Sequence, residues 1–376
     1  MSGPLQGLRV VELGGIGPGP FAAMVLADMG AEVIRIERPS GQNFVNQNLA
    51  MNRSRPGVVV DLRHPDGVDA VLRLVARADA LIDPYRPGVT ERLGVGPQTC
   101  LVRNPRLIYC RITGFGQEGP LATCAGHDIN YLSMSGLLHA VGRSDSPPVP
   151  PLNLVADFAG GGLLLAFAVV AGVLEARSSG KGQTVDVSML DAAALSGTFI
   201  YGLLAAGMWS DARANNLLDG ANPVYDTYET ADGQYLAVGA LEPEFQSQLF
   251  ERLGYDGEPW FGLDHHDDWP ARKAALTAIF RQRTRAEWLE LLEGCDACVT
   301  PVLSLHEAPM HEHNRVRGTF ADLGGVIQPA PAPRFSRTPG RISSLPAERA
   351  ALEEVLAPWG FDGDEVAALR AAGILG

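Results

Sequence analysis

Cysteine is scarce in this chain of 376 residues, which contains five. An odd number in a long sequence does not suit a disulfide framework, so cysteine usage favours the reducing conditions of the cytoplasm. Cys295 and Cys298 have CxxC spacing, but no second cysteine pair or nearby histidine completes a zinc site, and we interpret them as packing residues. His265-His266 and His311-Glu312-His313 lack the i, i+4 spacing of a helical zinc site. We therefore expect no metal centre.

Basic residues are also few. The chain has 30 Lys and Arg against 43 Asp and Glu, a net charge of −13 at pH 7. No block of Lys or Arg is long enough to follow a phosphate backbone, which argues against a nucleic-acid partner. Because the overall field is acidic, an anionic ligand would have to be held by a few local arginines.

Long hydrophobic runs are missing as well. The longest, around Leu163 to Leu174, is shorter than the roughly 18 to 20 residues that a membrane span needs, and we interpret it as a core helix. Met1 to Pro4 lead straight into a strand pattern, without the charged and apolar regions of a secretion signal. The C-terminal Gly373 to Gly376 is not a peroxisomal tripeptide. These features predict a cytoplasmic protein with no membrane span.

What the sequence does contain is the pattern of an α/β fold. Over the first 115 residues, apolar strands alternate with amphipathic helices, which predicts a Rossmann-like parallel sheet covered on both faces. Ligands of open α/β sheets bind in the loops at the carboxyl ends of the strands. The strands are expected at Leu8–Leu13, Glu32–Ile36, Val58–Leu62, Ala80–Ile82 and Leu107–Ile112, with a further strand at Thr184–Val187.

The pattern becomes antiparallel near residue 225. Asp232-Gly233 between alternating strands predicts a hairpin over Tyr225–Gly239 with a type I′ turn, and helices follow it. This indicates a second, smaller α+β domain joined by long linkers. The predicted boundaries are 1–188 and 330–376 for the large domain, 189–224 for a linker, 225–307 for the small domain and 308–329 for a return linker.

A glycine-rich turn follows the first strand, at Gly14 to Pro20. A GxGxxG match that starts at Gly15 fails because Pro20 replaces its last glycine and removes an N–H that a pyrophosphate would need. We therefore interpret the segment as a tight turn that lets a neighbouring group approach, and not as a dinucleotide site.

Several arginines follow or precede strands of the predicted sheet. Guanidinium groups gathered on one sheet edge would suit a ligand with several phosphates, because they pair phosphate oxygens bidentately. Ordinary surface arginines are the alternative. The residues concerned are Arg38, Arg53, Arg55, Arg86 and Arg92.

Two acid/base candidates lie in short polar segments. His127 stands in Gly126-His127-Asp128, where a histidine beside an aspartate can also be a structural pair. Asp157 precedes Gly160-Gly161-Gly162 at a helix start, where free N–H groups could meet a ligand oxygen, and it could equally be a plain N-cap. A carboxylate in that place is expected to have a lowered pKa unless burial opposes this. Glycines in a helix suggest that a backbone or a ligand comes very close.

The same segments resemble a known family over essentially the whole chain. The motifs that carry the resemblance are Gly7–Leu13, Asp28–Pro39, Asn52-Arg53-Ser54, Tyr85–Val89, Gly126–Tyr131 and Gly180–Asp191. They are similar to the CaiB/BaiF-type family III CoA-transferases and, within these, to the α-methylacyl-CoA racemases. The resemblance implies that CoA is bound as part of an acyl-CoA substrate, with no separate cofactor. It places Arg38, Asn52, Arg53, Ser54, Arg55, Asp61, Leu62, Arg86, Arg92, Gly126 and Tyr131 at the CoA site.

The resemblance also implies a mechanism and an assembly. Racemases of this kind exchange a proton at the carbon beside the thioester through an enolate. Two groups on opposite faces of the enolate are needed to invert the configuration of that carbon. His127, oriented by Glu242, would serve the S face and Asp157 the R face, with Asp128 in an auxiliary role. Backbone N–H groups near the glycines after Asp157 would stabilise the enolate. The family forms interlocked homodimers with shared active sites.

Alternatives remain open at this point. Transferases of the family use the aspartate that matches Asp157 as a nucleophile that forms an acyl anhydride, so a CoA-transferase is one alternative. A non-catalytic acyl-CoA-binding protein is another. Taken alone, Glu242 could be an ordinary carboxylate at a helix start. The acyl group is not determined by the sequence, and branched fatty acids, bile-acid precursors and arylpropionyl thioesters all fit.

Overall fold

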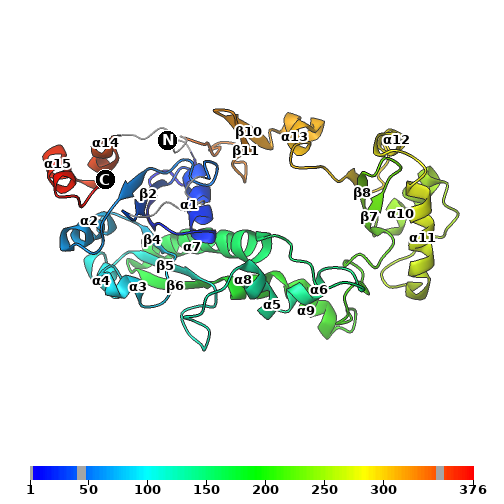
Figure 1. Ribbon diagram of the computed structural model, residues 1–376, viewed down its shortest axis with the longest axis horizontal. Coiled ribbons are helices and arrows are strands. Elements are labelled where there is room, and N and C mark those ends of the chain that lie inside the picture. The colour runs from blue at the N-terminus through cyan, green and yellow to red at the C-terminus, as the bar shows by residue number, and fades with distance from the viewer. Residues whose placement is uncertain (1–2, 40–47, 344–350) are drawn as a thin grey trace. The chain divides into compact units, whose positions relative to one another are not determined.

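The computed structural model describes residues 3–39, 48–343 and 351–376 (Figure 1). The chain divides into two compact units. The first comprises Met1–Ser135, Leu152–Ser196 and His313–Gly376, and the second comprises Gly136–Pro151 and Gly197–Glu312. The sequence-based boundaries put residues 189–196 and 313–329 in linkers, whereas their contacts group them with the first unit.

A six-stranded parallel sheet forms the centre of the first unit, which confirms the predicted Rossmann-like fold. The strand order is β3-β2-β1-β4-β5-β6. The strands are β1 (Arg9–Leu13), β2 (Glu32–Glu37), β3 (Gly57–Val59), β4 (Ala80–Asp83), β5 (Ile108–Thr113) and β6 (Gln183–Ser188). All six lie where strands were expected.

The strand order reverses between β1 and β4. From β1 the chain proceeds to β2 and β3 on one side, and from β4 it proceeds to β5 and β6 on the other. The loops that leave β1 and β4 therefore diverge, and they open a crevice at the carboxyl ends of these two strands. Such a switch point is where open α/β sheets bind ligands.

Helices cover both faces of the sheet (Figure 1). Val11, Leu81 and Tyr109 belong to a core that includes α2 (Pro65–Val75), α4 (Pro97–Arg103) and the C-terminal α15 (Gly363–Ala371). The opposite face packs against α1 (Pro18–Asp28) and α7 (Leu163–Ser179). A Cβ atom added at Gly172 of α7 would lie 2.8 Å from Ile108 of β5, so a glycine permits this close packing.

The C-terminus pairs with the edge strand β3. The N–H of Gly376 donates to the carbonyl of Val59 at 3.1 Å, and the N–H of Val59 donates to the carbonyl of Gly376 at 3.0 Å. Leu375 forms a further bridge with Val60. This return covers backbone groups that an edge strand would otherwise expose.

The long apolar helix begins earlier than the sequence indicated. A π-helical segment, η2 (Leu154–Gly162), runs directly into α7. In the described part of the chain, the joined run Leu154–Ser179 is long and apolar enough to cross a membrane by length and composition, and 39% of its most apolar window is buried. The helical run therefore extends beyond the apolar stretch Leu163 to Leu174 at both ends. Its contacts with β5 and α1 agree with the core helix that we predicted.

The second unit contains the predicted hairpin of β7 (Tyr225–Glu229) and β8 (Tyr235–Gly239), to which β9 (Val299–Pro301) adds a third antiparallel strand. The turn differs from the expected type I′. Gly233 has a positive φ of 71° but Asp232 does not, and the N–H of Thr230 donates to Gln234. A three-residue loop with glycine in the left-handed region results.

The other helices and strands complete the two units. Within the stretch expected to be a linker, α8 (Met189–Ser196) and α9 (Thr198–Ala205) follow one another and are separated at Gly197. The further helices of the described residues are α3 (Val89–Arg92), α5 (Asp128–Met134), α6 (Leu137–Ala140), α10 (Pro243–Leu253), η3 (His266–Asp268), α11 (Trp269–Phe280), α12 (Arg285–Leu291), η4 (Ala308–Met310), α13 (Glu312–Arg317), α14 (Leu352–Leu356) and η5 (Ala357–Trp359). An additional hairpin, β10 (Phe320–Leu323) and β11 (Val326–Pro329), lies in the stretch expected to be a linker.

Candidate active site

A hollow of about 360 Å³ lies at the carboxyl ends of β2 and β3, and we call it the edge pocket. Two exposed arginines from different loops, Arg38 and Arg92, line it together with Leu62. Asp61 also lines it, but both of its carboxylate oxygens accept hydrogen bonds from Arg63. These bonds lower the pKa of Asp61 to about 2. The full lining is Ile36, Glu37, Arg38, Pro39, Val60, Asp61, Leu62, Arg63, Tyr85, Val89, Arg92 and Leu93.

A second hollow, of about 330 Å³, lies at the strand-order reversal, and we call it the switch-point pocket. Its lining is Gly14, Gly15, Ile16, Pro20, Arg35, Glu37, Arg38, Asn52, Pro84 and Tyr85. Glu37, Arg38 and Tyr85 belong to both linings, so the two pockets adjoin at these three residues. Asn52, a predicted CoA contact, belongs to the second.

Tyr85 fixes the boundary between the two pockets. The Arg38 guanidinium lies 4.7 Å from the centre of the Tyr85 ring, a cation–π contact. The Tyr85 hydroxyl donates to the carbonyl of Gly14, and its N–H donates to the buried carboxylate of Asp83 at the end of β4. Sequence reasoning placed Tyr85 in a family motif but did not assign it to the site. Its position directly after a buried strand was the available signal.

The glycine-rich turn brings other groups close, as the sequence indicated. A Cβ atom at Gly15 would lie 2.5 Å from Pro84, and one at Gly14 would lie 2.7 Å from the carbonyl oxygen of Ile36. Gly17 has a φ of 71°, and its Cβ would lie 3.7 Å from Oδ2 of Asp157. The turn therefore runs from the switch-point pocket to the Asp157 carboxylate.

Asp157 lies within the π-helical η2 and is not an N-cap residue. Burial raises the pKa of its carboxyl; a hydrogen bond from Asn153 lowers it, the charge of Asp128 raises it and His127 lowers it. The net direction is upward, so burial overcomes the lowering that a helix start was expected to cause. Such a carboxyl is better suited to exchange protons near neutral pH than an ordinary exposed one.

His127 immediately precedes α5 and lies within the electrostatic reach of Asp157. Its backbone N–H donates to the side chain of Asn130 at 3.0 Å, which fixes the start of the helix. The imidazole is exposed. The two predicted acid/base groups are thus neighbours in the first unit.

Tyr131 explains the glycine before His127. Its hydroxyl donates to the carbonyl of Gly126, and a Cβ atom at Gly126 would lie 2.7 Å from its ring. Gly114 is required for the same reason, with its Cβ 2.3 Å from the ring. Burial raises the pKa of Tyr131 to about 12. The structure therefore gives Gly126 and Tyr131 a role in holding the His127 segment.

The three glycines after Asp157 serve packing. All three are buried, and their Cβ positions are occupied by Ala192 and Met189 of α8 and by Phe21 of α1. The N–H groups of Ala156 and Asp157 are bound by Asp128. The expectation that backbone N–H groups near the glycines after Asp157 stabilise an enolate stays a prediction.

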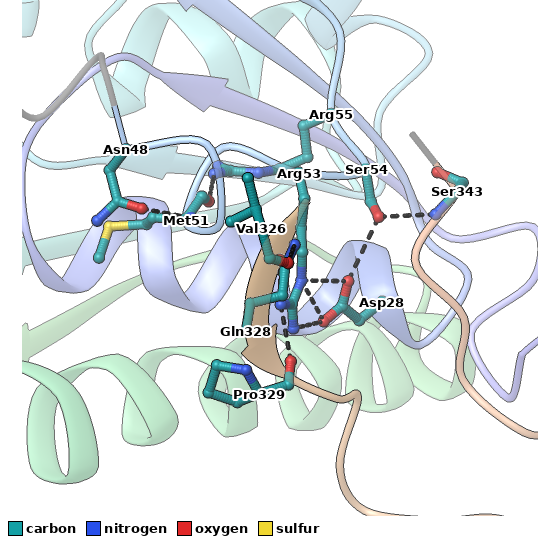
Figure 2. Close-up of polar contacts among 10 residues, drawn as sticks. All are labelled: Asp28, Asn48, Met51, Arg53, Ser54, Arg55, Val326, Gln328, Pro329 and Ser343. Carbon is teal, nitrogen blue, oxygen red and sulfur yellow. Dashed lines mark hydrogen bonds and ion pairs between the residues drawn. The ribbon is translucent and has the colours of Figure 1, made fainter. Parts of the chain in front are cut away.

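Arg53 and Ser54 lie elsewhere than expected. Figure 2 shows the Arg53 guanidinium against both oxygens of Asp28, with Gln328 accepting from it at 2.8 Å. The hydroxyl of Ser54 donates to Asp28 and accepts from the N–H of Ser343. The side chains of Arg53 and Asp28 are each only 3% exposed. Neither Arg53 nor Ser54 is at a surface that a phosphate could reach.

Arg55 is buried too. It forms an ion pair with Glu12 of β1, both side chains fully inaccessible, and it donates to the carbonyl of Met51 (Figure 2). The prediction that Arg53 and Arg55 contact CoA phosphates is corrected, because these charges already neutralise buried carboxylates. Local sequence does not distinguish such an arginine from a surface one.

Two other predicted site residues, Arg86 and Glu242, are both exposed. Arg86 is exposed and donates to the carbonyl of Thr123 at 3.5 Å, near the His127 segment. Glu242 is exposed and precedes α10 in the second unit, so its expected pairing with His127 stays a prediction. No cluster of three or more His, Cys, Asp or Glu residues that could hold a metal occurs in the described residues.

A parallel α/β sheet with an acid/base pair beside its switch point is the arrangement of an enzyme. The sequence matches CoA-transferase family III over residues 5–348. It is 45% identical over 371 residues to the α-methylacyl-CoA racemase of Mus musculus, with 97% of this chain and 96% of that protein covered. The Homo sapiens racemase is 42% identical over 374 residues, with 99% and 97% covered.

A solved structure shows the same fold. The crystal structure of a CaiB/BaiF family protein from Brucella suis superimposes with a TM-score of 0.79 at 27% identity, covering 99% of this chain and 100% of that one. The chain therefore belongs to CoA-transferase family III, as its motifs indicated.

The buried Glu12–Arg55 pair predicts a stability effect. Arg55→Met leaves the Glu12 carboxylate buried without a partner, and we expect a loss of about 3–5 kcal/mol in the free energy of unfolding. Glu12→Leu combined with Arg55→Met should recover most of that loss, because one polar atom of each side chain already lacks a hydrogen bond. Urea titration followed by circular dichroism measures both. Arg103→Met, at an exposed position, is the matched control, and an equal loss there would contradict the expectation.

Proposed function

We propose that this enzyme interconverts the (2R) and (2S) forms of 2-methylacyl-CoA thioesters by 1,1-proton transfer. The observation that carries the proposal is that Asp128, the residue after His127, accepts a hydrogen bond from the N–H of Asp157 at 2.8 Å. This bond holds the segments of two different acid/base groups together beside the turn that leaves the switch-point pocket. The near-full-length similarity to two α-methylacyl-CoA racemases supports it.

The chemistry needs two groups because one base would return the proton to the face from which it came. In one direction Asp157 removes the α-proton and His127 protonates the opposite face of the enolate, and the roles reverse in the other direction. Burial raises the pKa of the Asp157 carboxyl above its ordinary value, which favours its acting as a proton donor as well as a base. The reaction needs no separate cofactor.

The two pockets supply a path for the CoA moiety. Arg38 and Arg92 would hold phosphate groups in the edge pocket, where Leu62 and Val89 offer apolar surface to an adenine. The pantetheine arm would pass the Arg38–Tyr85 contact into the switch-point pocket. The thioester would then reach Asp157 along the turn that contains Gly17.

A CoA-transferase is the second candidate, favoured by the family name and by Asp157 alone. Its chemistry would join the Asp157 carboxylate to the acyl carbon and release CoA as the thiolate. A histidine beside the aspartate is unnecessary for that exchange. The racemase proposal accounts for both residues.

Racemisation tests the proposal directly. The wild type should convert a single enantiomer of a 2-methylacyl-CoA into a mixture of both without any acceptor acid. His127→Ala and Asp157→Ala should each lower the rate by about 10²–10⁴-fold, the usual contribution of general acid–base catalysis. Chiral chromatography of the hydrolysed acid gives the rate. A hydroxamate at Asp157, trapped with hydroxylamine and acyl-CoA, would establish the transferase instead.

The CoA path predicts two binding effects. Arg38→Ala and Arg92→Ala should each weaken binding of CoA about tenfold, because a charge-assisted hydrogen bond contributes about 1.5–3 kcal/mol and 1.4 kcal/mol is a factor of ten. Calorimetric titration with CoA at constant salt measures this. Arg103→Ala removes an exposed arginine outside both pockets and should change nothing. Unchanged affinity in both pocket variants would contradict the path.

We also propose that the protein is a homodimer. Leu163, Phe167, Val170 and Leu174 form one stripe of α7 by their 4-3-4 spacing, and Phe167 and Leu174 are 68% and 71% exposed. A contiguous exposed apolar stripe is typical of an interface. By the family resemblance, a partner chain would also bring its Glu242 to His127. The cytoplasmic location expected from the sequence stays a prediction.

Charge on that stripe should separate the subunits. Phe167→Asp with Leu174→Asp places two like charges in the proposed interface, and light scattering after size-exclusion chromatography should give the monomer mass of 40.0 kDa. Val102→Asp changes an equally exposed, isolated residue of α4 and should leave the dimer intact. A wild type that is itself monomeric at micromolar concentration would contradict the assembly.

A further inference from the structure

Asp128 joins the two segments that carry the acid/base groups. It is the first residue of α5 and follows His127 directly, yet it is 98% buried because only 2% of it is exposed. Its Oδ2 accepts a hydrogen bond from the N–H of Ala156 at 2.7 Å and another from the N–H of Asp157 at 2.8 Å. Through this one oxygen, the segment that contains His127 is bonded directly to the backbone of Asp157.

These two hydrogen bonds explain why the start of η2 can be irregular. The first N–H groups of any helix have no partner within the helix, and when buried they must find one elsewhere. Asp128 satisfies two of them from 28 and 29 residues away in the sequence. A carboxylate is also the favoured group at the positive end of a helix. Without Asp128, Ala156 and Asp157 would have buried donors and no fixed position relative to α5.

The remaining oxygen of Asp128 is unusual. Oδ1 is buried and has no hydrogen-bond partner among the described residues. A buried carboxylate with an unsatisfied oxygen is energetically unfavourable. The two hydrogen bonds that its other oxygen accepts offset this cost. Apart from its two N–H donors, nothing described neutralises it, so its negative charge acts on Asp157.

We propose that Asp128 is a positioning residue, which fixes the Asp157 backbone relative to His127 so that both groups address one α-carbon. This rests on the racemase function proposed above. Asp128 itself exchanges no proton with substrate in this role. It acts through the placement of Asp157 and through its own fixed negative charge.

The first test compares rates. Asp128→Ala should lower kcat about 100-fold, the effect of a displacement of about 1 Å at a reacting group, while KM for acyl-CoA stays nearly unchanged. Asp128→Asn keeps an acceptor oxygen and should retain part of the activity. In D2O, Asp128→Ala should slow α-proton exchange more for the enantiomer deprotonated by Asp157 than for the other. A role in folding alone would slow both exchanges equally.

The second test uses pH. Asp128→Asn removes a negative charge that raises the pKa of Asp157, so the acidic limb of kcat/KM should move to lower pH. The ionisable groups on the elements packed against η2 are His127, Asp128 and Tyr131 at α5, Asp191 on α8, Asp28 on α1, and Glu175 and Arg177 on α7. Asp191→Asn is the matched control, because it removes the same charge from an exposed position and should leave the limb in place.

The outcomes separate the two proposals. If the wild type exchanges no α-proton, the racemase function fails. If the wild type racemises, and Asp128→Asn leaves both the acidic limb and the ratio of the two exchange rates unchanged, the positioning role of Asp128 is wrong. Asp128→Asn is close in shape to the native residue, so it keeps the test valid if Asp128→Ala does not fold.

Discussion

The reversal of strand order between β1 and β4 is the constraint on which the rest of the site depends. Because the chain leaves β1 toward one side of the sheet and β4 toward the other, the two loops diverge at their carboxyl ends. The glycine turn after β1 and Tyr85 after β4 occupy this place, and the hydroxyl of Tyr85 bonds across it to Gly14. The switch-point pocket follows from this topology, and the turn directs it toward Asp157.

Buried charges hold the irregular segments around that crevice. Arg55 pairs with Glu12 inside the sheet, and Arg53 ties Asp28 to the returning C-terminal segment at Gln328 (Figure 2). Asp128 does the same for η2, whose first N–H groups it binds. The first N–H groups of a helix have no partner within it, and here a side chain from another segment supplies one. The scaffold therefore uses buried charged residues for order, whereas Arg38 and Arg92 are exposed.

Periodicity was sufficient to predict the sheet and the hairpin of the second unit, because buried strands and alternating strands leave local signals. The two acid/base candidates could also be named from the sequence, because His127 and Asp157 each stand in a recognisable local motif. The predictions that failed concern residues whose partners are distant in the sequence. Arg53 and Arg55 resembled ligand-binding arginines because nothing near them in sequence reveals Asp28 or Glu12. At the triple glycine, by contrast, the expected close approach of a backbone is made by α8, whose Ala192 backbone would lie 3.4 Å from a Cβ atom at Gly160. Tyr85 was not assigned to the site although its position after a buried strand was a local signal, and the β10–β11 hairpin lies in a stretch that was expected to be a linker.

The origin of the proton that inverts the α-carbon tests the two-group mechanism most directly. A single enantiomer of a 2-methylacyl-CoA is incubated with the wild type in D2O, and both enantiomers are recovered at low conversion for mass spectrometry. Transfer between His127 and Asp157 predicts that the newly formed enantiomer carries deuterium at the α-carbon while the remaining substrate is largely unlabelled. Equal labelling of both enantiomers from the earliest times, or an inverted product that retains the original proton, would contradict it.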